Sequence, residues 1–472
     1  MSSPASTVAV RRLDEAADLA AGVRSLSAAL AALPVAPGRL RRLEVPLAAP
    51  VAALDLPAGF ARGSLDPLAL LGPRWSGAGA SLERELGSLD RLADPDRWLA
   101  ALGWPADGPE LRFALSARFD PGRPPAPEWE AFGSCRVWLP AIECDGDAAC
   151  LALNWIDHAG KPGERERLRA ALDGWRPHVA TGAREPLAIA WNVDAGARRR
   201  WLDLVAAALA RIGDQAAAPP LVKIVLARRL DGALASAVHP ADLLGGTALG
   251  TVGWPWWIAR SGRSWLGESP EVLGVRADGR LRTVALAGTR GRAADPARDA
   301  ALGRELLACD KDGREQAAVA DWLRRQLARL SGREPVVGAL ELVRLPSLQH
   351  LGRSLETAVD PALPDRCWLD ALHPTPALCG APRAELRRWL RNVESFDRGL
   401  YGGVVGRIQR SRAEAHVAIR GVLVSGTDVA AYAGAGLVRG SDPVQEWAET
   451  GTKLAAICRR LGLATPGGEG ES

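Results

Sequence analysis

Residues 394–453 read ESFDRGLYGGVVGRIQRSRAEAHVAIRGVLVSGTDVAAYAGAGLVRGSDPVQEWAETGTK and carry the clearest structural signals of the chain. Two β-branched, apolar segments, 401–406 and 417–420, flank the polar turn QRSRAEA and predict two strands. Glycines inside such strands, and again at 434–436, allow a ligand or another backbone to approach closely and to meet bare N–H groups. The stretch therefore suits a small anionic ligand.

A helix is expected to follow this glycine-rich segment, with Asp442 near its N-terminus. Glu446, Glu449 and Lys453 then recur at positions i, i+3 and i+7, so all three share one helix face. Two acids and a base on one face suit a metal beside an anion. A solvated helix surface that pairs its own charges gives the same periodicity, so the spacing alone leaves both interpretations open.

The composition indicates a globular protein. The 472 residues are 47% hydrophobic and contain no window of 18 unbroken apolar residues, so we expect a large core and no membrane span. Acidic residues interrupt the N-terminal Ala/Leu runs, which argues against a signal peptide and favours a cytoplasmic location. The net charge of +4 is small and its arginines are dispersed, which argues against nucleic-acid binding. Seven scattered cysteines without a C-x-x-C pair predict free thiols.

Lysine is rare, since 59 Lys and Arg residues include four lysines and therefore 59 − 4 = 55 arginines. The lysines are Lys161, Lys223, Lys311 and Lys453. Lys223 lies in the buried-type strand LVKIVLAR, where an ammonium group is costly unless it is paired or neutralised. Unlike arginine, a lysine can lose its proton and act as a base. We therefore expect a functional role for each lysine except Lys161, which lies in a loop-like segment.

The two halves of the chain differ in chemical content. Residues 1–205 contain helix-like and strand-like segments but no cluster that indicates chemistry, so they are interpreted as the N-terminal scaffold portion of the same fold. A helix at about 197–213 leads into residues 206–465, the expected catalytic region. The tryptophans of TALGTVGWPWWIA in that region are most simply core residues.

Eight motifs in register resemble the chorismate-binding enzyme family, which includes isochorismate synthases, salicylate synthases, anthranilate synthase large subunits and aminodeoxychorismate synthases. They are KIVLAR (223–228), WLGESPE (265–271), ALAGTR (285–290), KDGRE (311–315), LQHL (348–351), LHPTP (372–376), ESFDRGLY (394–401) and GAGLVRGSDPVQEWAETGTK (434–453). The resemblance covers about residues 215–462. It implies an α+β fold like that of anthranilate synthase component I, with two packed, mainly antiparallel sheets and outer helices.

The resemblance also implies an activity. Lys223 matches the water-using members of the family, and the block LHPTPALCGAP looks more like isochorismate synthases than salicylate synthases. No G-x-C-x-G amidotransferase segment is present, so no glutamine amidotransferase partner is expected. The expected activity is Mg²⁺-dependent conversion of chorismate to isochorismate, for menaquinone or siderophore biosynthesis. A bifunctional salicylate synthase, which also eliminates pyruvate, and a catalytically silent chorismate-binding protein are the alternatives.

Specific roles follow from the resemblance for the reaction, which adds water at C2 of chorismate and expels the C4 hydroxyl. Lys223 is expected to be the general base that activates the water, and Glu271 the general acid that protonates the departing hydroxyl. Glu315, Glu446 and Glu449 are expected to hold Mg²⁺, which takes few protein carboxylates and keeps waters or substrate oxygens.

The remaining predicted residues bind substrate. Arg420 is expected to bind the enolpyruvyl carboxylate with the help of Tyr401, Gly434 and Gly436, because a planar guanidinium matches a carboxylate. Residues expected to line the ring or lie beside its carboxylate are Gly288, Thr289, His350 and Lys453.

Two further residues depart from the family pattern. Gln316 stands where a His is common, and Glu268 stands where a small or neutral residue is usual, so Glu268 either perturbs Glu271 or faces solvent.

Overall fold

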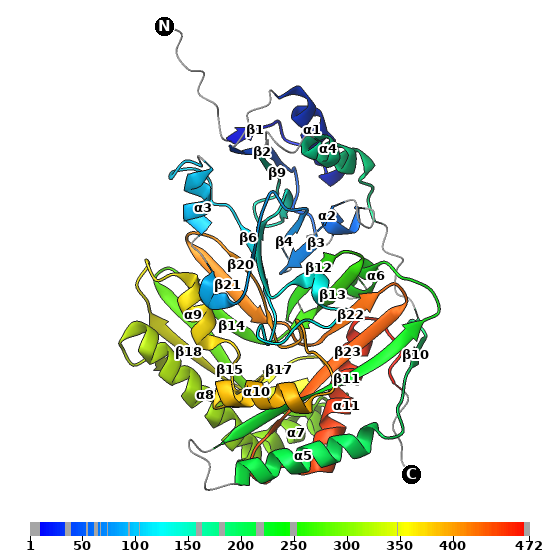
Figure 1. Cartoon of the computed structure of the whole chain (residues 1–472), viewed down its shortest axis with the longest axis vertical. Coiled ribbons are helices and arrows are strands. Elements are labelled where there is room, and N and C mark those ends of the chain that lie inside the picture. Colours follow the sequence, from blue (N-terminus) through cyan, green and yellow to red (C-terminus); the bar gives the residue numbers. More distant parts are fainter. Residues whose placement is uncertain are drawn as a thin grey trace.

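The computed structural model describes residues 10–33, 39–52, 55–60, 65–66, 68–72, 74–92, 95–102, 104–156, 163–178, 185–213, 221–245, 253–346 and 348–466. Within them, two extended sheets lie at the centre and helices lie outside (Figure 1). The expected α+β architecture of packed, mainly antiparallel sheets with outer helices is confirmed. No helix in these residues combines the length and apolar character needed to cross a bilayer.

One sheet contains thirteen of the described strands. Its order is β1 (Val10–Arg12), β2 (Leu40–Pro46), β9 (Cys150–Ile156), β8 (Ile142–Asp145), β4 (Trp75–Ala78), β3 (Leu68–Leu71), β12 (Trp254–Arg260), β13 (Arg263–Ser269), β22 (Gly421–Ser425), β23 (Asp428–Leu437), β11 (Lys223–Leu234) and β10 (Ile189–Trp191), with β19 (Gly380–Ala381) paired to β11. The β1–β2 pair is parallel and the other pairs are antiparallel.

The second sheet contains ten described strands and is antiparallel throughout. Its order is β16 (Val336–Val337), β18 (Leu348–Ala358), β15 (Arg280–Gly291), β14 (Val272–Ala277), β21 (Arg412–Val417), β20 (Val404–Ile408), β6 (Phe113–Ala117), β7 (Cys135–Leu139) and β5 (Leu82–Leu86), with β17 (Glu341–Arg344) paired to β18. Strands from before residue 205 thus enter both sheets, and the division into a scaffold portion (1–205) and a catalytic region (206–465) of one fold stays a prediction.

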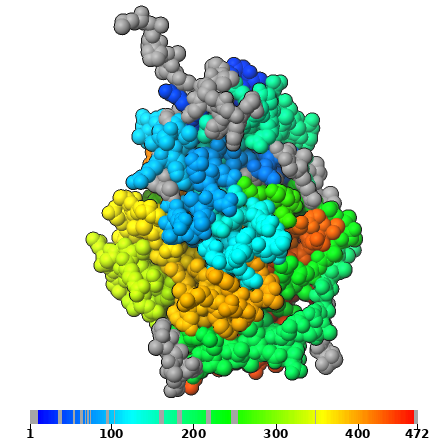
Figure 2. Space-filling view, in the orientation of Figure 1, coloured from blue at the N-terminus to red at the C-terminus, as the bar shows by residue number. Residues whose placement is uncertain are grey.

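The described helices cover the outside of the sheets. They are α1 (Leu19–Ala32), α2 (Asp55–Ala58), α3 (Pro95–Ala101), α4 (Glu164–Gly174), α5 (Ala197–Gly213), α6 (Pro240–Gly245), α7 (Pro296–Ala308), α8 (Asp310–Ser331), α9 (Asp365–Leu372), α10 (Arg383–Val393) and α11 (Pro443–Arg460), with short 3₁₀ turns η1 (Leu89–Arg91) and η2 (Glu130–Phe132). Helices α8 and α11 pack on β15 and β23, respectively. Figure 2 shows the early residues in blue and cyan above the later ones on one face.

Aromatic side chains fill the space between the sheets. Trp256 and Trp265 of the thirteen-stranded sheet share a buried cluster with Trp138 and Val405 of the ten-stranded sheet. Trp265 also meets Trp129 edge-on, with 5.4 Å between the ring centroids. Buried aromatic pairs add stabilisation beyond the apolar area they remove from water. The interpretation of the 254–257 tryptophans as core residues is confirmed.

The chain crosses between the sheets at two adjacent points. After β13 it passes through Pro270 and Glu271 into β14, and after β21 it passes through residues 418–420 into β22. The N–H of Val417 donates to the carbonyl oxygen of Glu271 over 3.0 Å, which ties the two crossings together. Glu271 and Arg420 are therefore held at the junction of the two sheets.

The prediction of strands at 401–406 and 417–420 is only partly right. The structure begins β20 at Val404, and the expected turn QRSRAEA contains most of β21. Ala413 and Ala415 alternate with polar residues and are buried, so this segment has the period of a strand in spite of its polarity. The helix expected near Asp442 is confirmed, since that side chain accepts a hydrogen bond from the N–H of Gln445 and caps α11.

Candidate active site

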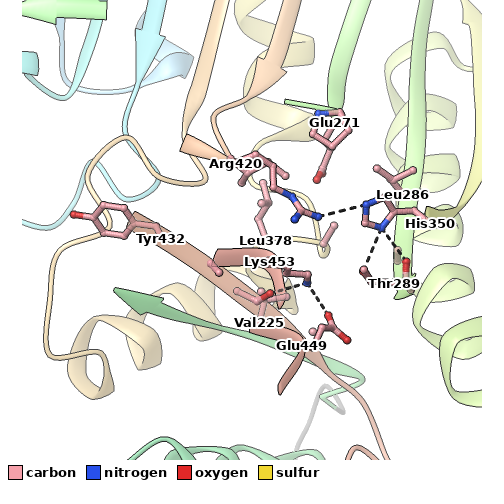
Figure 3. A pocket seen from close by; sticks show the side chains of 18 of the residues that line it. Val225, Glu271, Leu286, Thr289, His350, Leu378, Arg420, Tyr432, Glu449 and Lys453 are labelled. Carbon is pink, nitrogen blue, oxygen red and sulfur yellow. Dashed lines mark hydrogen bonds and ion pairs between the residues drawn. The ribbon is translucent and has the colours of Figure 1, made fainter. Parts of the chain in front are cut away.

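A cavity with about 760 Å³ of space, open to solvent, lies at the junction of the two sheets. Its wall combines strands β11, β15, β18 and β23 with α8, α11 and the crossing segments (Figure 3). Of the thirteen predicted site residues, twelve line it: Lys223, Glu271, Gly288, Thr289, Glu315, His350, Tyr401, Arg420, Gly434, Gly436, Glu449 and Lys453. The thirteenth, Glu446, lies beside the cavity and is buried. Residues far apart in the sequence thus converge as expected.

Glu271 is a buried carboxyl at the edge of this cavity. The Thr375 hydroxyl donates to its Oε1 over 3.4 Å, and its own N–H donates to the Ser269 hydroxyl over 3.1 Å. Burial raises the pKa of Glu271 to about 7, although nearby cations, chiefly Lys223, oppose the shift. A substantial fraction of Glu271 therefore carries a proton near neutrality, which suits a general acid.

His350 and Arg420 form a linked pair in the cavity (Figure 3). His350 Nδ1 lies 3.0 Å from the Gly288 carbonyl oxygen, and its Nε2 lies 3.4 Å from Arg420 Nη2. Burial, with the charges of Arg420 and Lys453, lowers the pKa of His350 to about 3, so the ring is neutral. A neutral ring that donates from Nδ1 to the carbonyl can only accept at Nε2, so His350 orients the guanidinium.

Arg420 keeps one nitrogen available for a ligand. Its Nη1 is buried and has no hydrogen-bond partner among the described residues. The residue adopts a left-handed backbone conformation with φ of +63°, which is uncommon for a non-glycine residue and typical of functional sites. A carboxylate in the cavity would supply the acceptor that Nη1 lacks.

Tyr401 faces the same cavity from the segment before β20. Its ring stacks on Tyr432 with 5.3 Å between centroids, and burial raises the pKa of its hydroxyl to about 12. The hydroxyl therefore stays protonated and can donate a hydrogen bond. A methyl group at Gly434 would lie 3.0 Å from that oxygen, so this glycine leaves room beside it.

Gly288 is the extra residue of a β-bulge between β15 and β18. The pairing skips it between Ala287 and Thr289, and its φ is +72°. The bulge brings the Thr289 hydroxyl to 3.2 Å from His350 Nδ1. The motif ALAGTR therefore positions the histidine.

Each carboxylate expected to bind metal is paired with a lysine. Lys223 Nζ lies 2.8 Å from Glu315 Oε1, Lys311 Nζ lies 2.7 Å from Glu446 Oε1, and Lys453 Nζ lies 2.6 Å from Glu449 Oε1. Lys453 also donates to the Gly434 carbonyl oxygen over 2.8 Å. The helix face of Glu446, Glu449 and Lys453 is thus turned inward and is not a solvated surface.

The chemistry of the three carboxylates fits a hard divalent cation such as Mg²⁺. Glu446 Oε2 is buried without a hydrogen-bond partner among the described residues, and burial with the charge of Glu449 raises the pKa of Glu446. Both features indicate a shortage of positive charge. In the described part of the chain, however, no three acidic, histidine or cysteine side chains converge closely enough to hold a metal as they stand. In this arrangement each of the three carboxylates contacts a lysine instead, so the metal site is not preformed.

Thr375 is a site residue that the sequence did not assign. It lies within the motif LHPTP, which was the available signal, and its contact with Glu271 depends on the loop between α9 and β19. Glu268, by contrast, does not face solvent. It is buried, accepts from the N–H of Gly253 over 3.0 Å and pairs with Arg460. Gln316 is also buried, away from the cavity lining.

Two other motif residues support the fold. His373 Nε2 donates to the Gly402 carbonyl oxygen over 3.0 Å, and Glu394 accepts from the N–H of Ala227 over 2.9 Å while pairing with Arg398. Both are buried, and neither lines the cavity. Lys161, expected to be a surface charge, lies outside the described residues.

Comparisons with known proteins agree with these motifs. A family model described as a chorismate binding enzyme matches residues 100–462. The isochorismate synthase MenF of Escherichia coli (strain K12) is 37% identical over 239 residues, which span 50% of this chain and 55% of that protein. The salicylate biosynthesis isochorismate synthase of Pseudomonas aeruginosa is 32% identical over 76% of this chain and 75% of its own length.

Solved structures share the fold over most of the chain. The structure of MenF from Escherichia coli superposes with a TM-score of 0.75 and 28% identity, covering 93% of this chain and 98% of MenF. Anthranilate synthase component I from Streptococcus pneumoniae superposes with a TM-score of 0.58 and 17% identity, covering 90% of this chain and 94% of that one. The expected fold type is confirmed.

Proposed function

Because this chain belongs to the chorismate-binding enzyme family, we propose that it is an isochorismate synthase that converts chorismate to isochorismate. The similarity to MenF and to the Pseudomonas aeruginosa enzyme, both named isochorismate synthases, supports this choice. The observation that carries the proposal is a single cavity lined by Lys223, by the partly protonated Glu271 and by Arg420 with its free Nη1.

The proposed reaction needs a base and an acid, and the cavity offers one of each. Lys223 takes a proton from the water that attacks C2, and Glu271 gives a proton to the hydroxyl that leaves C4. The two groups have different partners, Glu315 for the lysine and Thr375 for the glutamic acid, so they are not a mutual ion pair.

Chorismate carries two carboxylates, and the cavity offers cationic groups to receive them. Arg420 Nη1 binds the enolpyruvyl carboxylate while His350 holds Nη2, and the Tyr401 hydroxyl adds a second donor. Lys453 extends from α11 toward the ring carboxylate. Apolar side chains complete the wall around the ring, namely Val225, Leu286, Ala377, Leu378, Ile419 and Ile457. Such a lining excludes water and strengthens the charge contacts.

Glu315, Glu446 and Glu449 are the residues proposed to hold Mg²⁺. When bound, the ion would neutralise the three carboxylates and act as a Lewis acid toward the ring carboxylate. The support is the donor chemistry, the unpartnered Glu446 Oε2 and the raised pKa of Glu446.

The deciding experiment is an incubation of the purified full chain with chorismate and Mg²⁺, with the products separated by chromatography. We expect isochorismate in equilibrium with chorismate, and loss of turnover when EDTA removes the metal. Salicylate together with pyruvate would instead establish the salicylate synthase alternative. Binding of chorismate without any product would refute the enzymatic proposal. Whether the product enters menaquinone or siderophore biosynthesis is tested by which of the two a deletion strain lacks.

Gly436→Ala is expected to lower kcat by about 100-fold, because an ångström-scale displacement of reacting groups typically costs this much. A methyl group there would lie 2.2 Å from Glu315 Oε1 and 2.8 Å from Lys223 Cε, so both side chains must move. The initial rate of isochorismate formation measures the effect.

Gly451→Ala in α11 is the matched control, since a methyl group at Gly451 meets nothing within 4 Å. Alanine also favours a helix interior over glycine, so this variant should be active and no less stable. Full activity of Gly436→Ala would show that the Lys223–Glu315 arrangement is not needed for turnover.

A further inference from the structure

Lys311 stands apart from the other two lysines that pair with the carboxylates. Lys223 and Lys453 line the cavity and have proposed roles toward substrate, whereas Lys311 does not line it. Lys311 nevertheless contacts Glu446 on the neighbouring helix, with 2.7 Å between Nζ and Oε1. Because this contact between α8 and α11 lies outside the substrate cavity, a role toward substrate does not explain it.

The ammonium group of Lys311 lies within the field of all three carboxylates. Burial lowers the pKa of this group, but the charges of Glu446, Glu449 and Glu315 outweigh burial, so the pKa is raised overall. Glu315 follows Lys311 by four residues on α8, so both project from one helix face. The side chain of Glu446 is only 1% exposed, and within the described residues its one ion pair is with Lys311. Lys311 therefore occupies the electrostatic position that a bound cation would take.

We propose that Lys311 is the resident counter-ion of the carboxylate site and that a divalent cation must displace its ammonium group from Glu446 in order to bind. The inference rests on the proposed function, because Glu446 is there a metal ligand. The Lys311 side chain is 22% exposed, so it has a path to solvent when it leaves. This exchange keeps buried Glu446 neutralised in both states, since an unpaired buried carboxylate is costly.

The exchange predicts that removing Lys311 tightens metal binding. Mn²⁺ is the probe, because it prefers the same oxygen ligands as Mg²⁺ and its free ion is counted by electron paramagnetic resonance. In the full-length protein, Lys311→Met should bind Mn²⁺ about tenfold more tightly than wild type. The Lys311–Glu446 ion pair then no longer competes with the metal, and the free energy of one partly buried ion pair corresponds to about a tenfold change in affinity. Lys311→Arg, which keeps a competing cation, should not bind it more tightly.

Arg314→Met is the matched control for a general loss of positive charge. Arg314 precedes Glu315 on α8, is exposed and donates to the Arg439 carbonyl oxygen, not to any of the three carboxylates. Its replacement should leave Mn²⁺ affinity unchanged. Equal tightening in Arg314→Met and Lys311→Met would overturn the proposal, because net charge would then explain both.

Thermal unfolding provides a second readout that does not depend on turnover. Lys311→Met leaves Glu446 unpaired, so its Tm should fall without metal and rise on adding Mn²⁺ by more than the wild-type Tm rises. If this variant does not fold without metal, Lys311→Gln, which keeps a hydrogen-bond donor, takes its place. Unchanged or weaker Mn²⁺ binding in these variants, or none in any protein, would overturn the role of Lys311.

The same measurements separate this role from the proposed function. Wild-type turnover of chorismate combined with unchanged Mn²⁺ affinity in Lys311→Met would overturn the displacement and leave the function intact. Tighter Mn²⁺ binding in the variant, with no turnover of chorismate by wild type, would support the displacement and refute the function.

Discussion

Lys223→Met is expected to lower kcat for isochorismate formation by about 10³-fold, within the range attributed to a positioned general base. The side chain of Lys223 is 1% exposed and begins β11 at the cavity wall, where methionine preserves its length and most of its volume. Removing only the amine leaves the attacking water without a proton acceptor. The measurement is the initial rate under saturating chorismate, with Lys161→Met as the same substitution at a lysine outside every motif.

Lys223→Arg distinguishes a base from a structural cation. Arginine keeps the positive charge and can still pair with Glu315, but it does not lose its proton in a protein. If Lys223 acts only as the counter-ion of Glu315, Lys223→Arg should retain activity. If Lys223 is the base, both variants should be equally inactive while they still bind chorismate. An active arginine variant would therefore contradict the proposed mechanism.

Much of the fold could be predicted from local sequence because its signals are local. The periodicity of α5 and α11 and the Asp442 cap of α11 depend on neighbouring residues, and both helices lie where they were expected. The strand β21 was read as a turn because its residues are polar. Its Glu414 pairs with Arg407 on β20 and hydrogen-bonds His416, contacts that satisfy polar side chains within a sheet. These contacts are local, but they form only when β20 and β21 pair as a hairpin, so the polarity of the segment alone did not indicate a strand.

Motifs predicted which residues form the candidate site, but they did not predict which partners those residues contact. Lys311 was conspicuous as a rare lysine, but its partner Glu446 follows 135 residues later and meets it only because α8 and α11 come together. The same limit applies to Glu268, whose partner Arg460 lies on the last helix. Residue type indicated chemistry, whereas the pairing of charges required the packing of distant elements.

Glu271→Gln is expected to lower kcat by about 10²- to 10⁴-fold, because the amide cannot protonate the departing hydroxyl. In wild type the acid must carry its proton, and the pKa of Glu271 is about 7, raised by burial. The kcat/KM for chorismate should therefore fall as pH rises through about 7, because Glu271 loses its proton. Deprotonation of the general base can add a separate rise of kcat/KM at lower pH. The glutamine variant should lack that fall. A wild-type profile that stays flat from pH 6 to 8.5 would argue against Glu271 as the acid.

The same pKa shift predicts that Glu271→Gln makes the folded protein more stable although it lowers kcat. The native pKa of about 7 lies above the unfolded value of 4.5, so the native state binds more protons between these values and loses stability as pH rises through this window. Above pH 7 the full penalty is about 3 kcal/mol, from about 1.4 kcal/mol for each pKa unit. Glutamine removes it, so the free energy of unfolding at pH 8 should exceed that of wild type, while at pH 4 the two should converge. Urea unfolding at both pH values measures the difference. A variant less stable than wild type at pH 8 would show that the buried carboxylate is stabilised by its neighbours, and Glu271 would then be a structural ion and not a strained acid.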